Sequence, residues 1–580
     1  MTERGGPRLG AWPLADGRFR FRLWAPDAAE VALVLDGEPV AMAAEGEGCF
    51  VTEASCVAGT PYRYLIDGRQ QVPDPASRWQ PHGVDGASAV LPEQGHCWQT
   101  EWRGRPWQEL VIYEVHLGCS GGIAGLRAQL PALAALGITA LELMPVAQFP
   151  GRRNWGYDGV FPYAPAEAYG HPDDLKALVD AAHAQGLAVL LDVVYNHFGP
   201  QGNLLAQYAR PFFNPDAPTP WGDAIDFAQP AVQRFFIDNA LMWLQEYRFD
   251  GLRLDAVHAI APNAFLGQLE RAVRAACGSD RHVHLVLENE RNQAHWLRQG
   301  FQAQWNDDFH NALHVMLTGE QEGYYADYAG RATALLARCL GEGFAWQGER
   351  NHTGQRRGEP SADVPPERFV VFAQNHDQIG NRAFGERLST LVGAPQRRAA
   401  MALTLLTPMV PLLFMGEPWQ ARQPFQFFTD FEAPLDAAVR EGRRREFAGF
   451  AAFADEALRA RIPDPNDPAT MARSQVALPA PDDAQAAAEL AVFRQLLALR
   501  RHYLVPGLAQ ARPLGATVLA EGALNAGWQL PQGQWWIALN VGDAPVAHGL
   551  PAGEAVWVQG TAPTQALAAG GGVRVHWVPA

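Results

Sequence analysis

Eight apolar segments recur between Leu110 and Glu417, and polar loops and amphipathic helical patterns separate them. This alternation is typical of a parallel sheet with crossover helices, and eight strands are the number that closes a barrel. We therefore predict an α/β fold containing a (β/α)8 TIM barrel. The predicted strands are LVIYEVHL from Leu110, ALELMPV from Ala140, LAVLLDVVYNH from Leu187, FDGLRLDA from Phe249, HVHLVLENE from His282, AQWNDDFH from Ala303, FVVFAQNHD from Phe369 and VPLLFMGE from Val410.

The segments on either side of this region follow another pattern. Before it, short alternating runs such as FRFRLWAP and EVALVLDG predict an N-terminal β-sandwich. After it, the helical segment AELAVFRQLLALRRHYL precedes runs such as QWWIALNV, which predict a small antiparallel β domain. A chain of 580 residues is too long for one core. The predicted domains are a sandwich like that of carbohydrate-binding modules over residues 1–95, a catalytic barrel over 96–485, and a C-terminal helix and β domain over 486–580.

Composition narrows the choice of partners. A formal charge of -16 would repel nucleic acid and anionic membranes, whereas a neutral carbohydrate suits such a chain. The N-terminus lacks the apolar core of a signal peptide, and no run reaches the roughly 18 apolar residues of a membrane helix, so we expect a cytoplasmic protein. The six cysteines show no paired or metal-ligand spacing. We expect no cofactor and no metal, although the sequence leaves a structural calcium ion open.

Four predicted strands end in polar clusters, LLDVVYNH, LRLDA, LVLENE and FAQNHD, which a barrel would bring together at its C-terminal mouth. Asp255 and Glu288 end neighbouring strands. Adjacent strands lie about 4.8 Å apart, so these carboxyl groups could reach the roughly 5 Å separation of a retaining glycosidase. We expect Asp255 to be the nucleophile and Glu288 the acid and base, with Asp377 binding sugar hydroxyls and raising the pKa of Glu288. Taken singly, Asp255 could instead pair with Arg253, and Glu288 could cap the next helix.

The segments DVVYNH (192–197), GLRLDAVHA (251–259), LENE (287–290) and QNHD (374–377) resemble, in this order, the four signature segments of the α-amylase superfamily of glycoside hydrolases. The resemblance implies that Asp255, Glu288 and Asp377 are the nucleophile, the acid/base and the transition-state stabiliser. It further implies an arginine that orients the nucleophile and several residues that contact the sugar being cleaved. Matched in this way are Arg253, His197, His376 and Tyr157, and we expect Asp192, Asn196 and Asn375 of the same segments at the same site.

Longer stretches, among them LGITALELMPVAQFPGRRNWGYDGV and QNHDQIGNRAFGERL, resemble the maltooligosyltrehalose trehalohydrolases over most of the chain from about Phe19 to Trp419. This resemblance implies hydrolysis of the α-1,4 bond next to the terminal trehalose unit, and a functional partnership with the synthase that makes maltooligosyltrehalose. Where the family commonly has a second glutamate after MGE, this chain has Pro418, which is expected to alter the loop after the eighth strand. Candidate leaving-side contacts are His258, Asn289 and Glu290, and weaker candidates are Trp155, Arg152, Arg153, Trp221 and Asp308.

Two other functions stay open at this point. A glucan branching or α-1,6 debranching enzyme would share the sandwich, the barrel and the three carboxylates. A glucan-binding homologue without activity would tolerate the loss of a carboxylate, whereas all three are present here.

Overall fold

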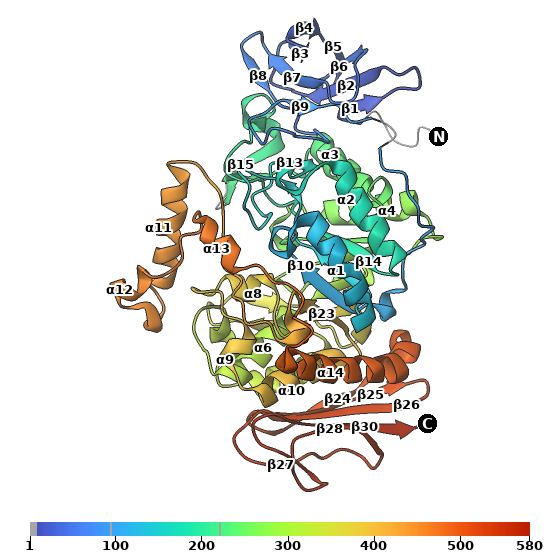
Figure 1. Ribbon diagram of the computed structural model, residues 1–580, viewed down its shortest axis with the longest axis vertical. Helices are drawn as coiled ribbons and strands as arrows, with labels where there is room; N and C mark the ends of the chain where they lie inside the picture. Colours follow the sequence, from blue (N-terminus) through green and yellow to red (C-terminus); the bar gives the residue numbers. More distant parts are fainter. Residues whose placement is uncertain (1–7, 93–94, 220–221) are drawn as a thin grey trace.

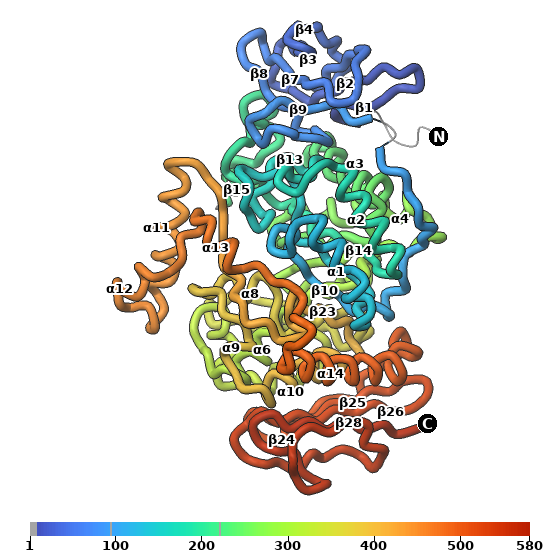
Figure 2. The backbone as a smooth tube through the Cα atoms, in the orientation of Figure 1, coloured from blue at the N-terminus to red at the C-terminus, as the bar shows by residue number. Residues whose placement is uncertain are grey.

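The computed structural model describes residues 8–92, 95–219 and 222–580. A central barrel lies between a β-rich N-terminal part and a C-terminal sheet, which form opposite ends of an elongated molecule (Figure 1). The path of the backbone shows that the chain passes through these three parts in sequence order (Figure 2).

The barrel consists of eight parallel strands that pair in sequence order and close on themselves, the last with the first. All residues of these strands are buried, which explains why each segment is a continuous apolar run rather than an alternating one. All eight predicted strands are confirmed. Each is shorter than its predicted run, and in β17, β18 and β22 the polar residues that end the run lie beyond the strand, at the mouth of the barrel. The strands are β10 (Ile112–Val115), β11 (Ala140–Leu143), β14 (Ala188–Val193), β17 (Gly251–Leu254), β18 (His284–Leu287), β19 (Ala303–Trp305), β22 (Phe369–Val371) and β23 (Val410–Phe414).

Helices pack around the barrel. In α2, the Asp174 side chain accepts a hydrogen bond from the His171 backbone N–H, and Gly186 follows the last turn with a positive φ of 73°. Such contacts are typical of the start and the end of a helix. The principal helices of this layer are α1 (Gly122–Leu136), α2 (Pro172–Ala184), α3 (Pro230–Gln245), α4 (Ala264–Cys277), α6 (Asp307–Thr318), α7 (Ala332–Glu342), α10 (Ala394–Leu406) and α14 (Ala484–Leu499).

The N-terminal part has two antiparallel sheets, as predicted. One has the order β1-β2-β6-β5 and the other β4-β3-β7-β8, with β9 paired to β7. In the first four residues of β2, buried and half-buried residues alternate, which is the pattern of a strand with one face in the core. The strands are β1 (Gly10–Pro13), β2 (Phe19–Trp24), β3 (Val31–Leu35), β4 (Glu38–Ala41), β5 (Ala43–Gly46), β6 (Cys49–Ala54), β7 (Pro61–Ile66), β8 (Gln70–Val72) and β9 (Ser88–Ala89).

The C-terminal part contains a five-stranded antiparallel sheet in the order β24-β25-β26-β30-β28, which confirms the predicted β domain. Helix α14 lies between this sheet and the barrel (Figure 1). The Trp535 indole N–H of β26 donates to the Leu406 carbonyl of α10 at 2.8 Å, so the sheet is also tied to a barrel helix. The strands are β24 (Arg512–Ala520), β25 (Ala523–Leu530), β26 (Gly533–Asn540), β28 (Glu554–Gln559) and β30 (Gly572–Pro579).

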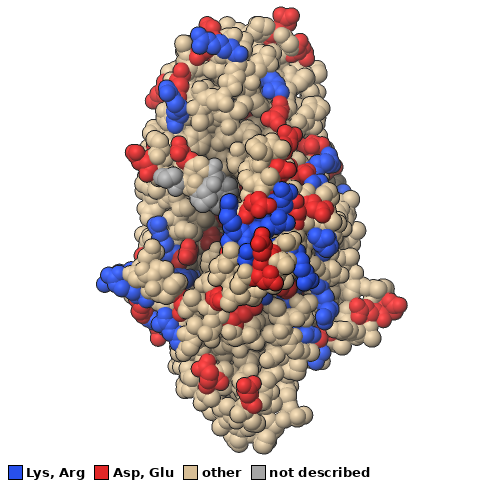
Figure 3. Space-filling view, turned by 90° about the vertical axis from the view of Figure 1, so that its left-hand side faces the viewer, with Lys and Arg blue, Asp and Glu red and all other residues tan. Residues whose placement is uncertain are grey.

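The connection between β23 and α14 contains three helices that the sequence analysis did not identify: α11 (Leu435–Phe447), α12 (Glu456–Arg459) and α13 (Pro468–Arg473). They project from one side of the barrel (Figure 1). On the face that includes this side, acidic and basic side chains are intermixed (Figure 3). Of the helices in the described part of the chain, none is both long and apolar enough to cross a bilayer.

Candidate active site

Two carboxylates meet at the C-terminal ends of β17 and β18. Leu254 pairs in register with Leu287, and the Glu288 backbone N–H donates to the Leu254 carbonyl at 3.0 Å. Asp255 and Glu288 are the next residues on the two strands, so the sheet places them side by side at the barrel mouth. Both side chains are only partly buried, at 14% and 18% exposure, and a ligand in the mouth can reach them.

One guanidinium group connects the acidic residues. The Arg253 Nη1 atom donates to both Asp192 oxygens at 2.9 Å and to Asp255 Oδ1 at 2.6 Å, while Nη2 lies 4.0 Å from Glu288 Oε2. The Arg253 side chain is buried, and its guanidinium lies 4.1 Å from the centre of the Trp305 ring. A cation held between an aromatic face and three carboxylates is fixed in position and favours the ionised form of its neighbours. The Arg253–Asp255 ion pair considered from the sequence therefore exists inside the site.

The pKa values of the two carboxyl groups at the strand ends move in opposite directions. Burial by itself would raise the pKa of Asp255, but Arg253, His197 and a hydrogen bond from Asn196 at 2.9 Å outweigh it, so the pKa is lowered. Burial raises the pKa of Glu288 well above its usual value, and the negative charges of Asp255 and Asp307 raise it further against the effect of Arg253. The Ala256 backbone N–H donates to Glu288 Oε2. These shifts favour the ionised form of Asp255 and the protonated form of Glu288, the combination that acid catalysis beside a nucleophile requires.

Asp377 and His376 begin the short helix α8 (His376–Gly380) after β22. Asn375 caps this helix: its buried Oδ1 accepts from the Asp377 backbone N–H at 3.0 Å. The Asp377 carboxylate is open to solvent and accepts from Asn381 at 2.6 Å. Protein atoms packed around the mouth raise the pKa of Asp377, which His376 and Arg253 oppose. The third carboxylate is therefore accessible to a bound sugar.

Glu114, the third residue of β10, holds His376. Its carboxylate accepts from the His376 backbone N–H at 2.9 Å and pairs with the ring Nδ1. Burial alone would lower the pKa of His376, but Glu114 overcomes this and raises it. The Tyr157 ring stacks on the imidazole with 5.1 Å between centroids, and its hydroxyl donates to Asp192 at 2.6 Å. These contacts fix an aromatic and a histidine beside the carboxylates.

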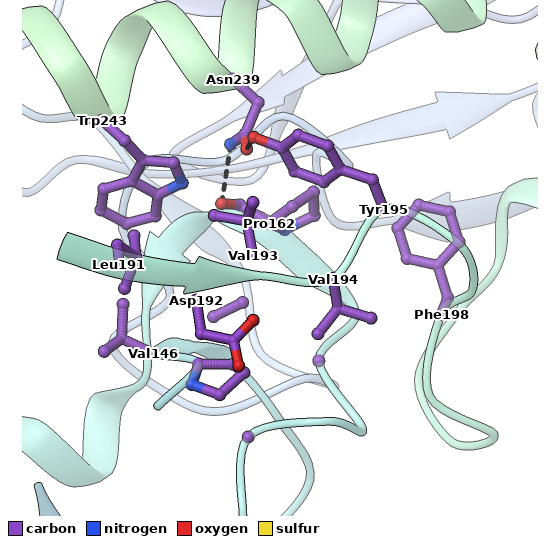
Figure 4. Close-up of a pocket in the computed structure, with 14 residues that line it drawn as sticks. Val146, Pro162, Leu191, Asp192, Val193, Val194, Tyr195, Phe198, Asn239 and Trp243 are labelled. Carbon is purple, nitrogen blue, oxygen red and sulfur yellow. Dashed lines mark hydrogen bonds between the residues drawn. The ribbon is translucent and has the colours of Figure 1, made fainter. Parts of the chain in front are cut away.

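Asp192 belongs to β14, and Asn196 and His197 follow this strand at the barrel mouth. Burial raises the pKa of Asp192 to about 6, although Arg253 lowers it. Asn196 also donates to the Asp255 backbone carbonyl at 3.1 Å, and His197 Nε2 lies 2.9 Å from the Tyr157 carbonyl. A cavity of about 20 Å³ lies beside Asp192, between β14 and α3 (Figure 4). It has room for about one water molecule and is too small for a larger ligand.

On the other side of Glu288, His258 and Glu290 face each other. The His258 Nε2 atom lies 3.8 Å from Glu290 Oε2, and burial lowers the pKa of His258. The Glu290 side chain is 68% exposed, whereas Asn289 is fully buried and accepts a hydrogen bond from the Arg291 backbone N–H at 3.1 Å. His258 and Glu290 can therefore reach a ligand next to Glu288, while Asn289 shapes the turn that follows it.

Comparison with known proteins places this geometry in a family. Residues 84–214 match the model of the alpha amylase catalytic domain. The malto-oligosyltrehalose trehalohydrolase of Deinococcus radiodurans is 42% identical over 85% of this chain and 83% of its own, and that of Rhizobium sp. is 39% identical over 95% of each. The chain belongs to the malto-oligosyltrehalose trehalohydrolase family. A crystal structure of a Salmonella typhimurium protein assigned to the alpha amylases has a TM-score of 0.93 at 42% identity and covers 98% of this chain and 99% of its own.

The residues that the sequence analysis named as weaker candidates for contacts with the substrate interact with other parts of the protein. Trp155 is buried, stacks on Phe425 at 5.2 Å and touches His376 edge-on. Arg153 pairs with Asp430. Arg152 is 67% exposed and pairs with Glu167 at 3.3 Å. None of these contacts points to a sugar. Trp221 lies outside the described residues.

Asp308 is fully buried. It accepts from the Asn292 amide, the Tyr328 hydroxyl and the Ala345 backbone N–H, and pairs with Arg357 at 3.0 Å. Its carboxylate is thus occupied by the protein and has no surface to offer a ligand. This position corrects the expectation of a sugar contact at Asp308.

Its neighbour Asp307 was not selected from the sequence but belongs to the site. Burial raises the pKa of Asp307 to about 6, and the charge of Asp377 raises it further. The carboxylates that raise the pKa of Glu288 are those of Asp255 and Asp307, whereas the sequence prediction named Asp377.

Glu114 and Arg357 were also missed. Glu114 is an acidic residue within an apolar strand, which is costly unless a partner compensates it, and this was the signal available. Arg357 belongs to a hairpin of β20 (Gln347–Arg350) and β21 (Arg356–Gly358) in the long polar loop before β22, and its Nε donates to the Glu290 carbonyl at 3.1 Å. Among the residues that the structure describes, no group of three or more potential ligands is arranged to hold a metal ion.

Proposed function

We propose that this chain hydrolyses the α-1,4-glucosidic bond next to the terminal trehalose unit of maltooligosyltrehalose, with retention of configuration. One observation carries the proposal. Asp255 and Glu288 lie at the ends of adjacent strands, share Arg253 and have pKa values shifted in opposite directions. Two carboxyl groups that differ in this way can serve as an acid and an ionised partner, and their place on adjacent strands fits the short separation of a retaining glycosidase.

The reaction follows in two steps. The Asp255 carboxylate attacks the anomeric carbon, while Glu288 gives its proton to the glycosidic oxygen and trehalose leaves as the alcohol. A covalent ester joins Asp255 to the glucan. Glu288, now a carboxylate, takes a proton from water, and the resulting hydroxide attacks the anomeric carbon. The ester breaks, the maltooligosaccharide leaves, and both carboxyl groups return to their initial state.

The surrounding residues bind the sugar and stabilise charge. Arg253 keeps Asp255 ionised and oriented, because it donates a charge-assisted hydrogen bond to Asp255 Oδ1 at 2.6 Å. We assign Asp377, His376 and His197 to hydroxyl groups of the sugar being cleaved, and Tyr157 to stacking on its ring. Because Asp377 is accessible and His376 is held by Glu114, both are in place before substrate binds.

The substrate assignment is supported by the names of the relatives. Proteins called malto-oligosyltrehalose trehalohydrolase align with 83% and 95% of their length. On the leaving side of Glu288, His258 and Glu290 are the side chains we assign to the trehalose unit. The proposal also places the chain in trehalose biosynthesis in the cytoplasm, after the synthase that forms maltooligosyltrehalose.

Product analysis tests this function. The purified chain is incubated with maltooligosyltrehalose and, separately, with the maltooligosaccharide of equal length, and products are followed by NMR. We expect trehalose from the first substrate only, and a new reducing end that is initially the α-anomer. Asp255→Asn should abolish release, whereas Asp280→Asn, which changes an exposed carboxylate, should not. An initial β-anomer would contradict the retaining mechanism.

The same assay separates the alternatives. A branching enzyme would release no trehalose but would increase the α-1,6 content of a linear glucan. A debranching enzyme would cut α-1,6 bonds, and an inactive homologue would bind glucan without turnover. Any of these outcomes would replace the proposed function.

A further inference from the structure

A second cavity lies at the end of the barrel opposite the catalytic carboxylates. It has a volume of about 460 Å³, within the range of roughly 300–1,000 Å³ that is usual for small-molecule sites. Val111 and Thr139 line this cavity and immediately precede β10 and β11. Asp255 and Glu288, in contrast, immediately follow β17 and β18. In a parallel barrel, strand starts and strand ends lie at opposite faces. This cavity is therefore separate from the active site.

The cavity wall has more cationic than acidic side chains. Arg105, Arg500 and Arg501 line it, together with one acidic residue, Glu109. The Glu109 carboxylate is paired with Arg105 at 3.2 Å. Two arginines of the wall thus lack a counter-charge, and within the described parts of the chain neither Arg500 nor Arg501 forms an ion pair. This local excess of positive charge, carried by the buried Arg500 and the exposed Arg501, is opposite in sign to the formal charge of -16 of the whole chain.

Arg500 shows the imbalance most clearly. It is 1% exposed, and its guanidinium donates to the carbonyls of Leu405, Thr407 and Met409 at 2.6–2.9 Å. Its buried Nε has no hydrogen-bond partner among the described residues. Burial lowers the pKa of Arg500 to about 9. Carbonyl groups orient this cation but do not neutralise it, so an anion in the cavity would be stabilised.

The remaining wall fits an organic molecule rather than a bare ion. Val111, Ile138, Leu497 and Val505 provide apolar surface, and the Gln185 amide adds a polar group. Gly137 leaves space for Arg501, because a Cβ atom there would lie 3.2 Å from its Nη2. Guanidinium groups bind phosphate through charge-assisted hydrogen bonds, and the apolar surface can cover a sugar ring. We propose that this cavity is a binding site for a phosphorylated sugar.

Calorimetric titration of the full chain with glucose 6-phosphate, inorganic phosphate and glucose tests the proposal without relying on catalysis. We expect glucose 6-phosphate to bind most tightly, with an affinity that falls as salt rises. Glucose alone should not bind there. If none of the phosphorylated ligands binds at millimolar concentration, or if glucose 6-phosphate binds no better than inorganic phosphate, the sugar phosphate site is refuted.

Variants locate the binding. Arg501→Gln should weaken glucose 6-phosphate binding at least about tenfold, because it removes a charge-assisted contact. Arg494→Gln is the matched control, since Arg494 is an exposed arginine of α14 that does not line the cavity. Both variants should unfold at the temperature of the unmodified chain. Equal affinity in the two variants, or displacement of glucose 6-phosphate by a glucan bound in the barrel mouth, would overturn the assignment.

Discussion

Arg253→Lys is the substitution that tests the site most directly. The arginine makes three hydrogen bonds of 2.6–2.9 Å to Asp192 and Asp255 from one nitrogen and lies 4.0 Å from Glu288. A lysine keeps the charge but has no planar fork, so at least one charge-assisted contact is lost. Such a contact contributes about 1.5–3 kcal/mol. If the whole loss falls on the transition state, kcat/KM decreases about 10- to 150-fold.

The same change should move both limbs of the pH profile. Arg253 lowers the pKa of Asp255, so a weaker cation lets this pKa rise and moves the acidic limb to higher pH. Arg253 also lowers the pKa of Glu288, so the alkaline limb rises as well. Because both limbs move in one direction, the optimum shifts upward rather than only narrowing.

The assay is kcat/KM for trehalose release across pH, with thermal unfolding as a check on the fold. Arg281→Lys is the matched control, because Arg281 also makes three hydrogen bonds of 2.5–2.6 Å. Its partners are main-chain carbonyl groups on α3 and just before β17, at the opposite end of the barrel from the carboxylates. It should leave the pH profile unchanged. An Arg253→Lys protein with the rate and both limbs of the unmodified chain would refute the reasoning.

Further predictions concern the neighbouring groups. Glu288→Gln should reduce trehalose release about 10²- to 10⁴-fold and remove the alkaline limb, because the amide has no proton to give; a retained limb would assign it to another group. Glu114→Gln should destabilise the fold mainly at low pH. The raised pKa of His376 contributes stability that is present below the pKa of this histidine in the unfolded chain and is lost as the pH rises through its pKa in the folded protein. The free energies of urea unfolding of the variant and the unmodified chain should therefore converge at high pH. Tyr157→Phe should lower the free energy of unfolding by about 1–3 kcal/mol, because Asp192 loses a buried hydrogen-bond donor while the ring still stacks on His376. An unchanged free energy of unfolding in urea would show that Asp192 finds another donor.

Much of the fold could be predicted because one physical pattern repeats. Each barrel strand is buried on both faces, so its sequence is a continuous apolar run that ends where the chain meets solvent. Helices α11, α12 and α13 escaped prediction because their sequences are polar and lie outside this rhythm. The boundaries at residues 95/96 and 485/486 stay predictions, and the second falls within α14, which is tied to helix α10 of the barrel by the Arg398–Glu489 ion pair.

The site was harder to predict where neighbouring residues have different surroundings. Asp307 and Asp308 are consecutive at the start of α6, yet Asp307 interacts with Asp377 and Glu288, while Asp308 is enclosed by Tyr328 and Arg357. The sequence shows two consecutive aspartates, but it does not show that the backbone points their side chains toward different surroundings. The carboxylates at the strand ends could be predicted because each follows a recognisable barrel strand, and the strands of a parallel barrel all end at the same mouth.

Charge balance below the sugar site explains why a single arginine has such influence. Glu114 and Glu142 pair in register on β10 and β11, and Glu142 is buried with neither oxygen hydrogen-bonded among the described residues. Burial, Glu114 and Asp192 raise the pKa of Glu142 well above its usual value, which favours its neutral form. The negative charges left beneath the mouth are then balanced by Arg253 on one side and by His376 on the other. Any change that weakens Arg253 makes ionisation of Asp255 and Glu288 harder at once, so the nucleophile and the acid should respond together.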